Sequence, residues 1–293
     1  PEQSRRRQER AYQNLQQQEG QTYDNPDLNP ATPEFDEPEG EITRGIQPQY
    51  GFHWDVLGEL ADTGMFQELI TAITKHESEM FTHEALGEYE AYNLQKTYQY
   101  GSARAFEQYY KKKLTELKIQ TVTDVVHKKK VFNSTQGPKA VFATGKYQII
   151  PDTLRLALTE TTGIDTNLKF NAVNQDRFGM YLLFMKREHM SKYLRGKGDA
   201  TGFQANMDMC EEWASCRLKF DSTRTNSHGI KPKAGESFYK GDNVNPTDLK
   251  IGQANELFTV QVQTREKVIQ DLSSPSSKLK PIFDKWKGNK WKL

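Results

Sequence analysis

The chain has 293 residues and nearly balanced charges, because 40 Lys and Arg face 39 Asp and Glu, which leaves a net charge of +1. Hydrophobic residues make up 35% of it, and no run approaches the roughly 18 apolar residues that a membrane span needs, so an integral membrane protein is excluded. The length is enough to bury a core without disulfides. Two cysteines, Cys210 and Cys216, exclude a disulfide scaffold and leave open whether they form one bridge.

The first 45 residues differ in composition from the rest. Five arginines face ten acids there, a net charge of −5, and residues 11–43 contain eight acids and no base. Few branched apolar residues are present to offset the entropy of ordering the chain. We predict an acidic, Pro- and Gln-rich linker or extended arm over 1–45 and a folded domain over 46–293. Because the chain starts at Pro1 without Met or a signal peptide, we expect a C-terminal part of a larger protein.

Hydrophobic spacing indicates that most of the folded part is helical. Apolar side chains at positions 66, 69, 70 and 73 follow the i, i+3, i+4, i+7 pattern of an amphipathic helix. The helices expected in chain order span about 66–77, 103–117, 121–130, 151–162, 173–194, 203–216 and 253–271. Residues 178–185 are apolar nearly all round, which is typical of a helix at the centre of a domain.

Signals for strands are few. Residues 141–150 contain β-formers around Gly145, and short strands or a hairpin are expected between 86 and 100. Residues 218–249 are rich in Gly and Pro, and a loop of that length is often functional or mobile. The lysine-rich tail from residue 270 predicts a solvated extension, with a surface for an anionic polymer as the alternative. The fold class is therefore mainly α, with a small β element.

Glu77 stands out on the first of these helices. Extending the apolar face of Ile70 and Ile73 by one turn places Glu77 on the core-facing stripe, at the helix end. Removal from water disfavours a charged carboxylate and raises its pKa, and a carboxylic acid that stays protonated near neutral pH can serve as a general acid. The alternative is an acid at the edge of the stripe, salt-bridged or exposed.

Further carboxylates follow in a turn-rich segment. They are Glu79, Glu84, Glu88 and Glu90. A glycosidase pairs its acid with a second carboxylate, roughly 5–5.5 Å away as a nucleophile or about 6.5–9.5 Å away when a water lies between them. Glu88 and Glu90 follow Gly87, where the chain can fold back toward the helix end. We predict Glu77 as the catalytic acid and Glu88 as its partner, with the distance between them undetermined.

Four short motifs occur in a distinctive order. They are His76-Glu77-Ser78, Ala91-Tyr92-Asn93, the stretch ATGKYQIIPDT at 143–153, and Asn174-Gln175-Asp176-Arg177 before the central helix. This order resembles the lysozyme-like family of peptidoglycan hydrolases, in particular the branch of soluble lytic transglycosylases and goose-type lysozymes, with related phage and secreted bacterial muramidases. The resemblance covers about 66–195, and more weakly the segment from Glu212-Trp213-Ala214-Ser215 to Tyr239-Lys240-Gly241-Asp242. It implies an α+β lysozyme-like fold.

The resemblance also implies roles for single residues. Glu77-Ser78 matches the family's catalytic Glu-Ser pair, and Gly145, Gln148, Pro151 and Thr153 match its Gly-x-x-Gln segment followed by Pro-x-Thr. Gln148 is then expected to hydrogen-bond a sugar amide or hydroxyl, and Tyr147 to lie against a sugar ring. Contacts with substrate are also expected from Tyr92, Asn93, Thr144 and Glu90. The alternatives are core packing for the tyrosines, a turn role for Thr144, and a bracing role for Gln175 and Asp176.

The implied function is cleavage of the β-1,4 bond between N-acetylmuramic acid and N-acetylglucosamine. Two departures bear on it: the stretch between Glu77 and Gly145 is longer than is usual in the family, with an inserted helix at about 103–117, and no motif fixes the second carboxylate. Two reaction types therefore remain as alternatives. One is hydrolysis, with Glu88 directing a water. The other is attack by the sugar's own 6-hydroxyl, which gives an anhydro product. A module that binds or supports the cell wall without cutting it also remains as an alternative.

Other chemistries lack their motifs. The segment at 76–83 has no H-E-x-x-H, because Met80 stands where the second histidine belongs, so no metal or other cofactor is expected. The expected partner is the peptidoglycan glycan strand, and an immunity protein or a secretion or virion component is a further possibility. We expect neither a nucleic-acid partner nor membrane insertion. The expected place of action is the periplasm or cell wall of a target bacterium, after secretion or delivery.

Overall fold

The computed structural model describes residues 51–77, 87–94, 101, 103–132, 137–242 and 249–287. Within these ranges helices dominate, and one antiparallel sheet has two short strands. The mainly α class with a small β element, which the sequence predicted, is confirmed. No helix in the described ranges is both long and apolar enough to cross a bilayer. The predicted arm over 1–45 lies outside the described residues.

The elements are short apart from one long helix near the C-terminus. The helices are α2 (Trp54–Asp62), α3 (Gln67–Glu77), α4 (Ala103–Tyr110), α5 (Ile119–Thr121), α6 (Pro151–Glu160), α7 (Ala172–Tyr181), α8 (Glu188–Leu194), α9 (Gly202–Glu212), α10 (Ile251–Leu272) and α11 (Lys280–Phe283). The 3₁₀ turns η3 (Glu88–Glu90) and η4 (Leu114–Glu116) and the π-helical stretches η5 (Val122–Val126) and η6 (Leu182–Lys186) lie between them. Strand β1 (Tyr92–Leu94) pairs with β2 (Val141–Thr144), with Tyr92 opposite Thr144.

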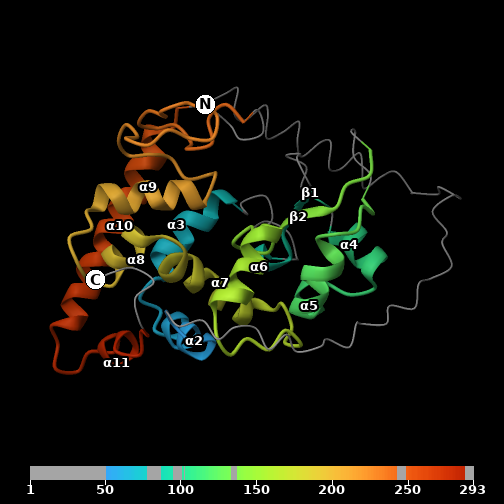
Figure 1. Ribbon diagram of the computed structural model, residues 1–293, viewed down its shortest axis with the longest axis horizontal. Helices are drawn as coiled ribbons and strands as arrows, with labels where there is room; N and C mark the ends of the chain where they lie inside the picture. The colour runs from blue at the N-terminus through green and yellow to red at the C-terminus, as the bar shows by residue number, and fades with distance from the viewer. Residues whose placement is uncertain are drawn as a thin grey trace, which may run out of the picture.

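The apolar run at 178–185 lies at the centre of the domain, as its composition predicted. Every residue in it is buried. Phe178 of α7 packs against Trp54 of α2, with ring centroids 4.7 Å apart, and Phe184 of η6 packs against Phe66, at 4.9 Å. In Figure 1, α7 lies between α3, α8, α9 and α10 on one side and the β1–β2 sheet with α4 and α5 on the other. This centre therefore joins the two sides that carry the predicted site residues.

Two of the expected helices are interrupted. The helix predicted over 103–117 stops at Tyr110, because Lys111 adopts a left-handed conformation with φ 55° and the chain turns into η4. The helix predicted over 173–194 breaks at Arg187, which is extended (φ −124°, ψ 129°). Local propensity allowed a helix in both places, so the packing of the flanking apolar residues decided where each helix ends.

The helix predicted over 203–216 ends early, and this redirects the chain toward α3. Thr201 caps α9 at its start in a capping box with Gln204. The helix ends at Glu212, since Trp213 is extended (φ −118°, ψ 116°) and its indole is buried. Cys210 and Cys216 are both buried free thiols, so the question of a bridge between them is answered in the negative.

The strand predicted over 141–150 is shorter than expected. β2 ends at Thr144, and a turn follows in which Gly145 has φ 73° before Ile149 bonds back to Thr144. Pro151 then opens α6 at the first helical position, as the sequence predicted. Two helices were not anticipated: α2, whose start is capped by the His53 ring, and the four-residue α11.

Candidate active site

Glu77 is the last residue of α3, and its carboxyl group accepts hydrogen bonds from Ser215, a residue in a distant part of the chain. The Ser215 backbone N–H donates to Oε1 at 2.9 Å, and the Ser215 hydroxyl donates to the same oxygen at 2.6 Å. Ser215 lies in the segment that follows α9, 138 residues further along the chain. The Glu77 residue is partly buried. Its carboxyl group is therefore held in one orientation by two donors on one oxygen.

The surroundings of Glu77 favour its protonated form. Burial raises the pKa of the carboxyl group, and the negative charge of Glu212 raises it further. The two bonds from Ser215 and the positive charge of Arg217 act in the opposite direction, and the net pKa lies above the ordinary glutamate value. Such a group keeps its proton to a higher pH than an ordinary glutamate, and once it has given the proton up its donors stabilise the carboxylate.

The segment that carries Ser215 is shaped by a buried arginine. Arg217 Nη1 donates to the carbonyl of Ala214 at 2.9 Å and to that of Ser215 at 3.2 Å. The Ser237 hydroxyl donates to the same Ala214 carbonyl at 2.8 Å. That carbonyl and the Ser215 N–H belong to one planar trans peptide and point in opposite directions, so holding the carbonyl directs the N–H toward Glu77. Arg217 thus acts on Glu77 both through its charge and through the backbone.

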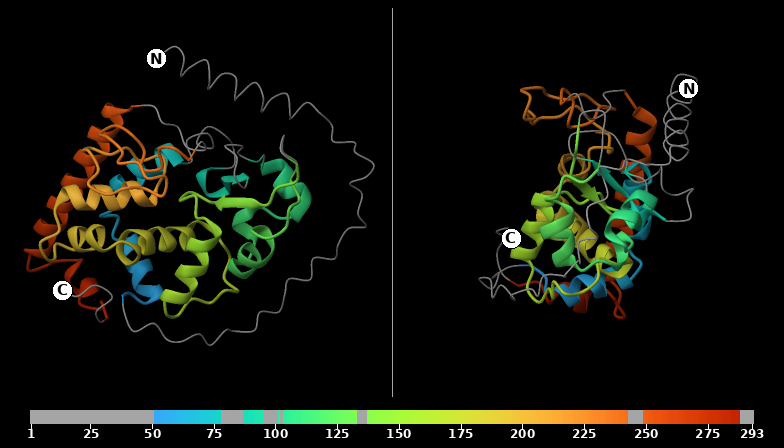
Figure 2. Two further views of the ribbon diagram at one scale, coloured as in Figure 1. Left: turned by 45° about the horizontal axis from the view of Figure 1, so that its top comes forward. Right: turned by 90° about the vertical axis from the view of Figure 1, so that its right-hand side faces the viewer.

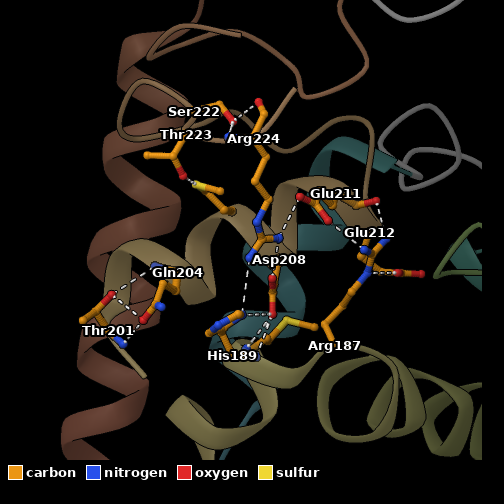
Figure 3. A network of polar contacts seen from close by, with 12 residues as sticks. Arg187, His189, Thr201, Gln204, Asp208, Glu211, Glu212, Ser222, Thr223 and Arg224 are labelled. Carbon is orange, nitrogen blue, oxygen red and sulfur yellow. Dashed lines mark hydrogen bonds and ion pairs between the residues drawn. The ribbon is translucent and has the colours of Figure 1, made fainter. Parts of the chain in front are cut away.

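An ion-pair network fixes the end of α9, as Figure 3 shows. Lys186 Nζ lies 2.6 Å from Glu212 Oε1 and also donates to the Thr153 hydroxyl at 2.8 Å. Arg187 contacts Glu211 at 2.7 Å and Glu212 at 3.2 Å. The Glu212 side chain is 5% exposed, so the two cations replace the water that its charge loses. The network thereby holds a negative charge near Glu77.

A second part of the same network ties the 218–242 segment to α8 and α9. Arg224 Nη1 contacts Asp208 at 2.8 Å and Glu211 at 2.7 Å (Figure 3). The other oxygen of Asp208 accepts the first backbone N–H groups of α8, from His189 at 2.8 Å and Met190 at 3.1 Å. The long loop predicted after residue 217 contains no regular element in its described part, 218–242. It is anchored there by charged side chains.

Glu88 belongs to a different cluster, around the turn after β2. Lys146 Nζ lies 2.7 Å from Glu88 Oε1 and donates to the Tyr89 hydroxyl at 3.2 Å. Burial lowers the pKa of Lys146, but its bond to Glu88 and the neighbouring charges outweigh burial, and the net pKa is raised. Lys146 therefore holds its proton more tightly beside Glu88 than it would in water. The Tyr89 and Tyr147 hydroxyls both donate to Asp176 of α7, Tyr147 at 2.8 Å.

Gln148 has two unusual properties. Its backbone is left-handed, with φ 46°, a conformation that a residue with a side chain rarely adopts. Its amide Nε2 donates to the Gly145 carbonyl at 2.8 Å, while its Oε1 is buried without a hydrogen-bond partner among the described residues. A buried acceptor without a partner costs about 1–3 kcal/mol. Such strain is often kept where a ligand group completes the bonding.

Gln175 braces this turn from the central helix. It is fully buried, accepts the Lys146 backbone N–H at 3.0 Å, and donates to the carbonyls of Tyr89 at 3.0 Å and Phe170 at 2.8 Å. These are the contacts of a bracing residue. Together with the shared Asp176 contacts, they hold η3, the turn at 145–148 and α7 as one unit.

Four of the expected substrate contacts are not available in this structure, because the side chains are buried. Tyr92 is 0% exposed and packs against Phe106, Thr144 is 0% exposed, and Tyr147 is 3% exposed. Glu90 is also buried and bonds to the Thr115 backbone and hydroxyl. The alternatives of core packing for the tyrosines and a turn role for Thr144 describe what is observed.

Asn93 is not buried like the four residues above, and the expected partner of Glu77, Glu88, is not among the charges that act on it most strongly. Asn93 is partly exposed, and its Oδ1 accepts the Ala143 backbone N–H at 3.1 Å, which braces the sheet. The charges that act most strongly on Glu77 come from Arg217 and Glu212 rather than from Glu88. Glu79 and Glu84 lie outside the described residues.

Sequence reasoning did not single out Ser215, Arg217, Glu212 or Lys146 as site residues. One signal was present: the segment from Glu212 to Ser215 belonged to the weaker part of the family resemblance. Lys146 also lay within the stretch ATGKYQIIPDT, and Arg217 within the weaker part of the resemblance, but neither was given a role because a basic residue in a loop is usually solvated. Comparisons with family models, with curated proteins and with solved structures found no match.

Proposed function

We propose that this chain is a lysozyme-like glycosidase that cleaves the β-1,4 bond between N-acetylmuramic acid and N-acetylglucosamine in peptidoglycan, with Glu77 as general acid. The observation that carries the proposal is the environment of Glu77: a carboxyl group at the end of an apolar helix face, with a raised pKa, oriented by two donors from Ser215. The order of motifs over 66–195 supplies the substrate class by resemblance. The geometry around Glu77 supports the chemistry without depending on that resemblance.

The proton transfer follows from the bonding of the two carboxyl oxygens. Both Ser215 donors are used on Oε1, so a protonated Glu77 carries its proton on Oε2. Oε2 donates that proton to the glycosidic oxygen as the bond to the sugar C1 breaks, which leaves positive charge on the ring. Glu77 becomes a carboxylate in this step, and the Ser215 donors and the charge of Arg217 stabilise it. The same carboxylate can then accept a proton from the attacking hydroxyl.

Two completions of the reaction differ in their need for a second carboxylate. Hydrolysis uses a water, directed by Glu88, which is 27% exposed and paired with Lys146. The second candidate is intramolecular attack by the 6-hydroxyl of the muramic acid residue, which gives an anhydro product and needs Glu77 alone. The contacts of Glu88 with Lys146 and of Glu212 with Lys186 favour this second route, because the carboxylate oxygen that each lysine holds is already engaged and is not open to a water.

Gln148 is proposed as a substrate contact through its amide oxygen, which is buried in this structure, so the turn at 145–148 has to move for a sugar to reach it. The Oε1 atom has no hydrogen-bond partner among the described residues, and the N-acetyl group of either sugar carries an N–H that can donate to it. Binding of that N–H would remove the penalty of the unpaired acceptor. On this proposal, the left-handed backbone at Gln148 orients the amide oxygen for the substrate, and this role accounts for the strained conformation.

The test is the variant Glu77→Gln, assayed on purified peptidoglycan. A general acid contributes typically 10²–10⁴-fold, so release of muropeptides is expected to fall by about 100-fold or more. The amide that replaces the carboxyl group keeps an oxygen that accepts both Ser215 bonds, so at acidic pH, where both side chains are neutral, the melting temperature is expected to change little. The matched control is Glu68→Gln on the same helix, whose exposed ion pair with Lys267 contributes little to stability.

The mass of the released muropeptides separates the two routes, since the anhydro product is lighter by one water. A Glu77→Gln protein with full activity removes the proposal. Binding of peptidoglycan by the wild type without any muropeptide release favours a module that binds the cell wall and does not cut it.

A further inference from the structure

The segment over 103–142 is the most basic part of the molecule. It contains nine Lys and Arg and three Asp and Glu, a net charge of +6, so the remaining residues of the chain together carry −5. Residues 133–136, which lie outside the described residues, include no charged residue, so all twelve of these charges lie at described positions. We call residues 103–142 the basic segment. Lys128 pairs with Asp124 at 2.7 Å, but three acids cannot pair with all nine cations, so the segment keeps a positive charge.

Seven of the nine cations are exposed. They are Arg104, the triplet Lys111–Lys113 and the triplet Lys128–Lys130. The first triplet follows α4, where the left-handed Lys111 ends the helix and turns the chain outward. The second follows η5. Both triplets therefore lie at the ends of helical elements, on turns that extend into solvent.

The fold brings these two turns to the same aromatic cluster. Phe132, two residues after the second triplet, packs against Tyr110 and Tyr109, each with ring centroids 6.2 Å apart, and these tyrosines directly precede the first triplet. Lys139 lies beside Phe132 through two backbone hydrogen bonds, of 3.1 Å and 2.8 Å. Cations that are widely separated in sequence are thus gathered around one rigid core.

This cluster also contacts the strand that follows Glu88. Tyr92 of β1 packs against Phe106 at 5.2 Å and Phe132 at 5.4 Å, and β1 directly follows η3, which carries Glu88. Figures 1 and 2 place α4 and α5 on the side of the molecule opposite α10, next to the β1–β2 sheet. A partner bound at the basic segment would therefore lie near the β1–β2 sheet.

We infer that the basic segment binds a phosphate-bearing linear polymer of the cell envelope, the poly(glycerol phosphate) type of wall polymer. The choice of this polymer rests on the proposed function, because such polymers are attached to the glycan that Glu77 would cut. Eight of the nine cations are lysines. Lysine contributes a mobile point charge without the bidentate geometry of arginine, which suits a flexible chain of repeated phosphates. Bound polymer keeps the enzyme on its insoluble substrate between cleavages.

The experiment measures binding of the full chain to purified poly(glycerol phosphate) by titration at 50 and 200 mM salt. With a slope of about 0.7 per phosphate contact, as for a single strand, about six contacts predict an affinity loss of about 300-fold over this range. The variant K128Q/K129Q/K130Q, and separately K111Q/K112Q/K113Q, should bind about tenfold more weakly and with a flatter salt dependence. The matched control, K231Q/K278Q/K280Q, removes the same charge from exposed lysines outside the basic segment and should bind within about twofold of the wild type.

Several results would overturn the inference. They are no binding at 50 mM salt, an equal loss in the control variant, and tighter binding of a DNA oligonucleotide of equal charge, which would assign the surface to nucleic acid. Tighter binding of a synthetic peptide with residues 11–43 would assign it to the chain's own acidic segment. The soluble polymer has no β-1,4 glycosidic bond to cut, so its binding does not depend on catalysis by Glu77. A failed binding titration therefore leaves the Glu77→Gln assay valid. A fully active Glu77→Gln variant likewise leaves the measured binding valid.

Discussion

The contact between Ser215 and Glu77 gives a prediction whose size can be worked out from the structure. In the variant Ser215→Ala the hydroxyl donor to Oε1, at 2.6 Å, is lost, while the backbone N–H at 2.9 Å remains. A hydrogen bond to a charged group contributes about 1.5–3 kcal/mol. Because the backbone donor remains and the site is partly exposed, we take the lower limit, about 1.5 kcal/mol. This energy favours the ionised form of Glu77, so its loss raises the pKa.

The assay is the pH dependence of kcat/KM on peptidoglycan fragments. Glu77 must be protonated to act as an acid, so the high-pH limb reports its ionisation in the free enzyme. Since about 1.4 kcal/mol corresponds to one pH unit, the limb in Ser215→Ala should move up by about one pH unit. The plateau at low pH should fall by up to about tenfold, because the carboxylate formed in the reaction loses a donor.

The control variant is Ser222→Ala, which loses a buried hydroxyl that bonds to the Arg224 backbone. It should shift neither the limb nor the plateau. An unchanged limb in Ser215→Ala, or one that moves to lower pH, would show that Ser215 does not stabilise the ionised carboxyl group of Glu77. Thermal melting of both variants checks that each is folded.

Two further predictions concern stability. In Gly145→Ala the new methyl group would lie 2.0 Å from Gln175 Oε1 at a left-handed φ of 73°, so unfolding in urea should show a loss of about 2–4 kcal/mol, whereas Gly229→Ala, with the same φ and open space, should lose about 1 kcal/mol. Equal losses in the two variants would refute the clash. Burial raises the pKa of Glu77 in the native state, so the native state binds this proton more tightly than the unfolded chain does. The tighter proton binding stabilises the native wild type at low pH. This stabilisation is lost as the pH rises through the native pKa. Melting curves should therefore show Glu77→Gln gaining on the wild type from acidic to alkaline pH, and a constant difference would contradict the raised pKa.

The residues with local signals were predicted well. The spacing of Ile70 and Ile73 placed Glu77 on the buried side of α3, and the side chain is partly buried there. Pro151 correctly predicted the start of α6, and the apolar run at 178–185 correctly predicted a buried centre. These features depend on contacts within a few residues or on composition, which the linear sequence contains.

The roles of the tyrosines and of Glu88 were not decided by the sequence. A tyrosine combines an apolar ring with a polar hydroxyl, so the same residue type suits a core or a ligand contact. Tyr92 packs against Phe106 in the core. Tyr147 is also buried, and its hydroxyl donates to Asp176. Glu88 was expected to face Glu77, yet its partner is Lys146, which is brought to it by the pairing of β1 with β2.

The sequence by itself determined a mainly helical chain, a basic segment between two parts of the motif order, and a glutamate at the end of an apolar helix face. Only the tertiary structure decided which groups meet that glutamate: Ser215 arrives because Trp213 is extended and ends α9, and Arg217 shapes the segment between them. The physical reason is range. Periodicity is set by neighbours along the chain, whereas the protonation of Glu77 depends on donors and charges that reach it through space from residues far along the chain.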